Sequence, residues 1–181
     1  LLSDLVTHKT IHGARLRCNE LTSQHDFEQA TVSIAELKIA LAKVFPDETV
    51  YMIVTAANND GLRGVDSKSP RSKSISDELD KASDAFFGSS KNTDYFQQED
   101  RYEGDAKSNK KPVFTGSDAH SFDDLNRLSG DEAGYEPTWI KADLTFRGLR
   151  QTLFEPKGRV HIGERPTVLE RLDQDATRFI S

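Results

Sequence analysis

Short apolar runs that alternate with polar stretches dominate the pattern of hydrophobic and polar positions along this chain. The runs cover residues 50–55 (VYMIVT), 85–88 (AFFG), 112–115 (PVFT) and 139–142 (WIKA). The first run lacks the alternation of a strand with one wet face, which is typical of strands covered on both faces in parallel sheets. The pattern therefore predicts four strands of a parallel sheet.

Helix signals stand between these runs. Four hydroxyl residues precede apolar residues at helical spacing and are expected to be N-caps: Ser33, Ser74, Ser121 and Thr145. Glu36 completes a capping box with Ser33, while Pro46 and Pro156 are expected to end the first and last of these helices. This alternation argues for an α/β fold whose parallel sheet is either open or closed into a barrel.

The strand count and the chain ends indicate a piece of a longer protein. A closed barrel core needs roughly eight strands, and four are visible. The chain begins at Leu1, its only methionine is Met52, and residues 177–181 read like the opening of a strand. We therefore expect part of the fold to lie before Leu1.

Two polar stretches, residues 58–73 and 89–111, interrupt the alternation. Such long loops are uncommon in compact domains and are usually functional or mobile. Both follow predicted strands, which in an α/β barrel places them on the face that carries active sites; surface insertions are the alternative. Three aromatic residues of the second stretch either stack on nucleic-acid bases or pack the loop onto the fold: Tyr95, Phe96 and Tyr102.

Composition and charge limit the classes of function. A net charge of −6 does not attract nucleic acid or anionic membrane through its bulk field. The single cysteine, Cys18, excludes an intrachain disulfide and a cysteine-based zinc cluster. Without a signal peptide or an apolar run of membrane-spanning length, the expected compartment is the cytoplasm. No phosphate-binding loop is present, so we expect no nucleotide site in this segment.

The sharpest candidate chemistry lies directly after the third apolar run, in the sequence TGSDAHS at 115–121. In extended backbone, residues two apart point to the same side, so Asp118 and His120 can converge on one cation. Zinc, manganese or iron suits that mixed oxygen and nitrogen set. A bound metal lowers the pKa of a water and stabilises charge on a phosphoryl oxygen. Alternatively, Asp118 turns the loop and His120 bonds locally.

Other residues are weaker candidates for metal ligands. His8 and His12, four residues apart, either share a helix face and bind metal or lie on the surface. The same two interpretations apply to His25, which stands beside Asp26. Asp60, in the sequence NNDG, either ligates a metal or occupies an ordinary turn.

Basic residues in the same half of the chain either contact phosphate or form a solvated surface: Lys107, Lys110, Lys111, Arg127, Lys141, Arg147 and Arg150. His161 is expected in a strand and not in a metal site. The spacing of the chain's serines, histidines and its cysteine suggests no nucleophilic triad.

Residues 113–121, with Gly-Ser-Asp-Ala-His at their centre, resemble the last metal-binding motif of PHP-domain (polymerase and histidinol phosphatase) phosphoesterases. Residues 138–151 and 154–156 resemble the TrlF-like subgroup of this family, large bacterial proteins in which a PHP domain precedes an ABC/SMC-like ATPase. The resemblance is strong over 112–165, extends over 50–111 and is weak over 1–49.

That resemblance implies a distorted seven-stranded α/β barrel that binds two or three divalent metals. Family ligands come from an early His-x-His pair, central Glu and His residues, and a final Asp-x-His. Only the last maps here, onto Asp118 and His120, and the early pair would lie before Leu1. By the same resemblance, residues 1–165 are the C-terminal portion of a PHP-like domain, and 166–181 are a linker and the start of a following domain.

The leading hypothesis is a metal-dependent phosphoesterase module that hydrolyses nucleic-acid phosphodiesters. The resemblance implies the substrate, since the family couples this domain to an ATPase, an arrangement associated with DNA or RNA processing and phage defence. One alternative is a catalytically inactive regulatory or scaffolding domain, which Asn58 and Asn59 favour because the family often places a histidine there. The other alternative is a small-molecule phosphatase.

Overall fold

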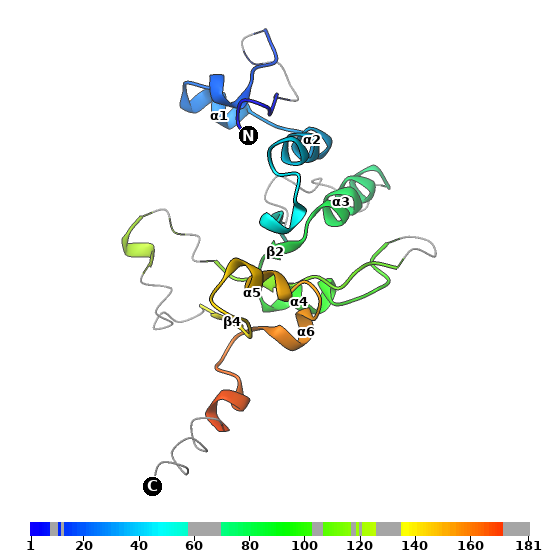
Figure 1. Ribbon diagram of the computed structural model, residues 1–181, viewed down its shortest axis with the longest axis vertical. Coiled ribbons are helices and arrows are strands. Elements are labelled where there is room, and N and C mark those ends of the chain that lie inside the picture. Colours follow the sequence, from blue (N-terminus) through cyan, green and yellow to red (C-terminus); the bar gives the residue numbers. More distant parts are fainter. Residues whose placement is uncertain are drawn as a thin grey trace. The chain divides into compact units, whose positions relative to one another are not determined.

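The structure, a computed structural model, describes residues 1–7, 11, 13–57, 70–102, 107–116, 119, 121–125 and 135–171, the side chains of 70–73 excepted. The chain divides into two compact units, Leu1–Tyr51 and Met52–Ser181, which are treated separately below. Figure 1 traces the helices and strands in the colours of the sequence.

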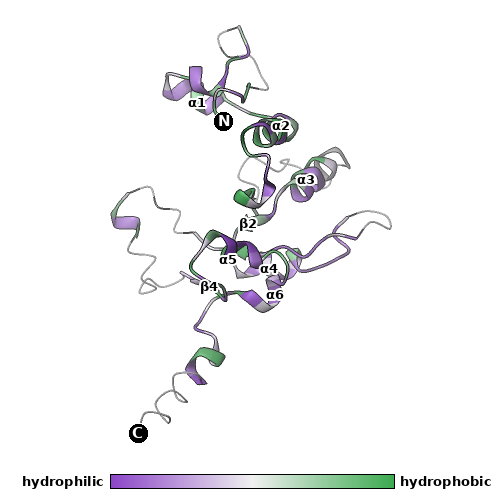
Figure 2. Ribbon diagram, viewed as in Figure 1, coloured by the Kyte–Doolittle hydropathy of each residue, from purple (hydrophilic) through white to green (hydrophobic). Residues whose placement is uncertain are grey.

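The first unit is built from short helical segments: η1 (Cys18–Glu20), α1 (Gln24–Gln29), α2 (Ile34–Val44) and η2 (Glu48–Val50). The predicted cap of α2 is confirmed, because Ser33 Oγ accepts the N–H of Glu36 at 3.2 Å. Figure 2 shows that α2 carries both hydrophobic and hydrophilic residues, and its buried residues are Ala40 and Leu41. Thr7 is fully buried beside the chain segment that contains Leu16, whose N–H donates to Thr7 Oγ1 at 3.0 Å.

The second unit follows a strand and helix alternation. Its elements are β1 (Val54–Ala56), α3 (Pro70–Ala82), β2 (Ala85–Phe87), α4 (Ser90–Phe96), β3 (Val113–Phe114), β4 (Thr138–Ile140), α5 (Phe146–Gln151), α6 (Pro156–Arg159) and β5 (Val160–Ile162). β1, β2 and β3 form a parallel sheet in that order. The expected α/β fold with a parallel sheet is therefore confirmed.

The two faces of this sheet have different surroundings. The register pairs Phe86 with Val113 on one face, and both side chains are almost fully buried. The ring of Phe96, on α4, stacks on Phe86 with 3.8 Å between ring centroids. The register pairs Phe87 with Phe114 on the opposite face, where Phe87 remains 53% exposed. The core of the unit thus lies on the α4 side of the sheet.

The fourth predicted strand does not continue the parallel sheet. β4 pairs antiparallel with β5, with Trp139 opposite His161. Helices α5 and α6 occupy the connection and return the chain to run against β4, and Trp139 Nε1 donates to the carbonyl of Gly163 at 3.0 Å. The strand position expected for His161 is confirmed. Within the described ranges the strands form these two sheets and close no barrel.

Several element boundaries differ from those predicted. The first strand begins at Val54, because residues 48–50 take a 3-10 turn. α3 begins at Pro70, four residues before the expected cap Ser74, since proline suits the first turn of a helix, where its missing N–H costs nothing. For the same reason Pro156 opens α6 as well as following α5. The second polar stretch contains α4, which was not expected.

Two buried cations fasten the segment that follows α4 onto α3. The Arg101 Nε donates to Asp80 Oδ2 at 3.2 Å, and its other nitrogens donate to the carbonyls of Phe96 at 3.0 Å and Asn109 at 2.7 Å. The Lys111 ammonium donates to the carbonyl of Asp80. Among the described residues, Asp80 Oδ1 has no hydrogen-bond partner. Through these hydrogen bonds Arg101 joins the end of α4 and the residues around Asn109 to α3.

Among the helices that the structure describes, none has the length and hydropathy needed to cross a membrane.

Candidate functional site

The carboxyl ends of β1, β2 and β3 lie level at one edge of the sheet. The register pairs Ala56 with Phe87 and Phe87 with Phe114, which are the last residues of the three strands. Beyond them the N–H of Ala57 donates to the carbonyl of Phe87 at 2.7 Å, and the N–H of Gly88 to that of Phe114 at 2.8 Å. In α/β barrels the active site lies at this edge, and in open α/β sheets ligands bind outside it where the strand order reverses.

A carboxylate from outside the parallel sheet reaches this edge. The N–H of Ser90, the first residue of α4, donates to Glu136 Oε2 at 3.4 Å. Helix α4 starts close to the strand ends because Gly88 has no side chain. A Cβ there would lie 2.6 Å from Asn92 Oδ1 and 2.8 Å from the Cβ of Ala57. No sequence signal pointed to Glu136, since its place depends on contacts with residues 46 positions away.

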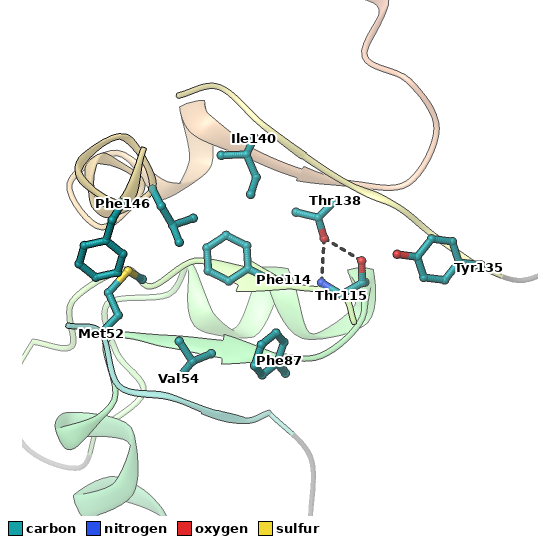
Figure 3. Close-up of a pocket in the computed structure, with 10 residues that line it drawn as sticks. Met52, Val54, Phe87, Phe114, Thr115, Tyr135, Thr138, Ile140 and Phe146 are labelled. Carbon is teal, nitrogen blue, oxygen red and sulfur yellow. Dashed lines mark hydrogen bonds between the residues drawn. The ribbon is translucent and has the colours of Figure 1, made fainter. Parts of the chain in front are cut away.

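Thr115, the first residue after β3, is fixed by three hydrogen bonds, of which Figure 3 shows the two with Thr138. Its N–H donates to Thr138 Oγ1 at 2.7 Å, and its hydroxyl donates to the carbonyl of Glu136 at 2.8 Å. The hydroxyl oxygens of Thr115 and Thr138 are 2.7 Å apart. The start of the run that contains Asp118 and His120 is therefore held against β4.

A pocket of about 460 Å³ opens beside Thr115, on the sheet face that carries Phe87. Its lining comes from the strands β1 to β4, the segments beside them and α5: Met52, Val54, Phe87, Phe114, Thr115, Tyr135, Thr138, Ile140, Phe146 and Leu149. All ten side chains are uncharged. Figure 3 shows the Tyr135 hydroxyl directed toward the two threonines.

The predicted metal ligands Asp118 and His120 lie outside the described residues, as do Asp60, His8 and His12. The strands that precede Asp60 and Asp118 end at the same edge of the sheet, with β2 between them. In the part of the chain that the structure describes, no group of three or more His, Cys, Asp or Glu side chains is placed to hold a metal ion.

His25 lies exposed on α1, next to an aspartate that has a structural role. Asp26 is buried, and its Oδ2 accepts the N–H groups of Thr22 at 3.2 Å and Ser23 at 3.1 Å. This carboxylate therefore stabilises the start of α1.

The basic residues divide between structural and exposed positions. Lys111 is buried and bonds backbone carbonyls. Lys107 and Lys110 lie 3.8 Å and 3.2 Å from the Glu99 carboxylate, and the Lys110 hydrogen bond is the main reason why the pKa of Glu99 is lowered. Lys141 and Arg147 are exposed, Arg150 is half-buried, and Arg127 lies outside the described residues.

The aromatic residues of the second polar stretch pack against the fold. Phe96 is buried on Phe86, and Tyr95 meets the ring of Phe96 edge-on with 5.0 Å between centroids. The Lys81 ammonium lies 4.7 Å from the ring centre of Tyr102. Burial, and to a smaller extent the charge of a nearby aspartate, raises the pKa of Tyr102. The packing interpretation thus accounts for Phe96.

Comparison of this chain with family models, curated proteins and solved structures found no match. The functional interpretation consequently depends on the residues and geometry of the chain itself.

Proposed function

We propose that this chain is part of a metal-dependent phosphoesterase in which Asp118 and His120 bind a divalent cation at the carboxyl edge of the β1–β2–β3 sheet. The supporting observation is the position of Thr115. It follows β3 directly, is held by three hydrogen bonds at that edge, and precedes Asp118 by three residues. Ligands of parallel α/β folds bind at this edge.

The donor chemistry fits such a metal. An aspartate oxygen and a histidine nitrogen suit manganese, zinc or iron. The carboxylate of Glu136, which accepts the Ser90 N–H, lies at the same edge. A bound metal would supply a water of lowered pKa and stabilise charge on a phosphoryl oxygen. In this proposal Asp118 and His120 bind the ion, while the hydrogen bonds between Thr115 and Thr138 fix the residue from which their segment starts.

The resemblance of residues 113–121 to the last PHP motif supports two finer proposals. The first is that the parallel sheet belongs to a distorted seven-stranded barrel, of which this chain forms the C-terminal portion. The second is that the substrate is a phosphodiester of nucleic acid and that a downstream ATPase is the partner. The net charge of −6 lends no support to the nucleic-acid proposal.

Hydrolysis assays on the intact protein test this function. With Mn²⁺, Zn²⁺ or Fe²⁺ present, we expect cleavage of bis(p-nitrophenyl) phosphate, and Asp118→Asn or His120→Gln is expected to lower kcat/KM by at least about 100-fold because each removes a metal ligand. Asp123→Asn and His161→Gln are matched controls, expected to stay within about twofold. Asp123 is exposed and His161 lies in β5.

Three outcomes separate the candidates. Loss of diester cleavage in both ligand variants supports the phosphodiesterase. A clear preference of the intact protein for p-nitrophenyl phosphate, a monoester, would indicate a small-molecule phosphatase instead. The absence of metal-dependent cleavage of either ester would contradict the enzyme and favour a regulatory or scaffolding domain.

A further inference from the structure

The pocket beside Thr115 is lined by uncharged, mostly apolar side chains, which play no part in binding a metal ion. Its volume of about 460 Å³ falls within the range of small-molecule sites, roughly 300–1,000 Å³. Its ten lining side chains carry no charge, so a phosphate group gains no ion pair inside it. The pocket instead suits an uncharged part of a ligand whose charged group lies elsewhere.

Hydrogen bonding at the polar corner of the pocket selects the kind of uncharged group. Because the Thr115 hydroxyl gives its only proton to the Glu136 carbonyl, the bond between the two threonine hydroxyls must use the proton of Thr138. The Thr138 oxygen also accepts the Thr115 N–H. Each hydroxyl therefore keeps one acceptor position and no spare proton. The Tyr135 hydroxyl, which is directed toward the pair, has one proton and can fill only one of these two positions. At least one acceptor position remains for a ligand that donates a hydrogen bond.

The remaining walls are apolar and include several aromatic rings. Phe87, Phe114, Phe146 and Tyr135 contribute aromatic rings (Figure 3), and Phe87 and Phe146 are 53% and 42% exposed. Exposed aromatic faces stack readily on planar rings, since every nucleobase has a π-face. The lining thus combines a stacking surface with hydrogen-bond acceptors.

We propose that this pocket binds the base of a nucleoside phosphoester, with preference for bases that carry an exocyclic amino group. The proposal rests on the proposed function, in that the phosphoester would extend from the pocket toward the loop that contains Asp118 and His120. Thr115 lines the pocket and precedes Asp118 by three residues, so the two proposed sites are neighbours in the sequence. The pocket would then determine which phosphoesters are substrates, and the metal loop would not.

The chain provides a reporter for this proposal, because its single methionine, Met52, lines the pocket. In protein labelled with [methyl-¹³C]methionine, the Met52 methyl signal, identified by its loss in Met52→Leu, can be followed by NMR during titration with adenosine in EDTA. We expect a saturable shift with adenosine and none with inorganic phosphate. Purine riboside, which lacks the amino donor, should bind about threefold to tenfold more weakly.

Two phenylalanine variants provide a matched comparison. Phe146→Ala removes an aromatic wall and should weaken adenosine binding at least about fivefold. Phe154→Ala removes an 81% exposed ring that does not line the pocket, and should leave binding within about twofold of the original. The comparison of adenosine with purine riboside needs no variant, so it remains decisive if Phe146→Ala does not fold.

Four results would overturn the proposal: no saturable shift at millimolar adenosine, an equal response to phosphate, equal binding of purine riboside, or unchanged binding in a folded Phe146→Ala variant. Because EDTA removes metal, this titration is independent of hydrolysis. If adenosine binds but the Asp118 and His120 variants keep full activity, base binding stands and the proposed function fails. If these variants lose activity and adenosine does not bind, the proposed function stands and the base-binding proposal fails.

Discussion

Replacing Arg101 by methionine is expected to destabilise the second unit strongly. The Arg101 side chain is fully buried and pairs with Asp80, whose side chain is 4% exposed. It also donates to the carbonyls of Phe96, Gln98 and Asn109. Methionine has a similar volume but no donor, so Asp80 Oδ2 and the Asn109 carbonyl lose this partner. The Phe96 carbonyl keeps the N–H of Lys111, and the Gln98 carbonyl keeps the Ser108 hydroxyl.

The magnitude follows from the buried carboxylate. Removing one partner of a buried ion pair typically costs about 3–5 kcal/mol, because the remaining charge stays desolvated and unpaired. The carbonyls add little to this cost, because those of Phe96 and Gln98 keep other donors and Asn109 is exposed to water. Whole domains are stable by only about 5–15 kcal/mol, so Arg101→Met should remove a large part of the total.

Urea unfolding followed by fluorescence measures this loss, because the only tryptophan, Trp139, lies in β4 of the same unit. The double variant Asp80→Leu, Arg101→Met removes both charges and should recover at least about 1 kcal/mol relative to the sum of the single variants. Arg147→Met, at an exposed position, is the control and should change stability by less than about 0.5 kcal/mol. A loss below about 1 kcal/mol for Arg101→Met, or strict additivity in the double variant, would refute the reasoning.

Two further predictions concern stability and titration. Gly148→Ala should destabilise the chain by about 1–3 kcal/mol or more in the same unfolding assay, since a Cβ there would lie 2.2 Å from the carbonyl oxygen of Asp143. The control is Gly158→Ala, which should be neutral or stabilising because a Cβ there has nothing within 4 Å. Equal effects of the two substitutions would contradict this prediction. Burial raises the pKa of Tyr102 above its ordinary 10.0, so this hydroxyl ionises at a lower pH in the unfolded chain than in the folded chain. The free energy of unfolding is therefore unaffected by this group below about pH 10 and falls as the pH rises through the folded-state pKa. Titration of tyrosinate absorbance should show a component above pH 10 that Tyr102→Phe removes; a component at or below pH 10 would show that burial has no such effect.

Local signals in the sequence predicted much of the second unit. The apolar runs around Val54, Phe86 and Val113 became the three parallel strands, because burial on a sheet requires such residues. The caps at Ser33 and Thr145 formed as expected, since a cap needs only the next three residues.

Features that depend on distant residues were not predictable in this way. An apolar strand such as β4 has no signal for the direction of its partner, which the helices at 146–159 determine. Helix α4 looked like a polar loop because its burial depends on one side chain, Phe96, stacked on Phe86. The polar character of α4 otherwise matches that of a surface loop.

In the candidate site, too, the features set by neighbouring residues could be predicted and those set by distant residues could not. The position of Thr115 after β3 indicated an edge where ligands bind, and the structure gives three hydrogen bonds that fix it there. Glu136 and the pocket could not be predicted, because the lining joins Met52 and Val54 to residues more than 90 positions later, such as Phe146. Only the folded chain brings these residues together.

Binding of Mn²⁺ to the intact protein, followed by the EPR signal of the free ion, tests most directly whether Asp118 and His120 share one metal ion. We expect at least one site per chain, weakened at least about tenfold by Asp118→Asn or by His120→Gln. The double variant should be little worse than either single one, because both side chains would serve the same ion. Unchanged Mn²⁺ binding in the double variant would contradict the metal site.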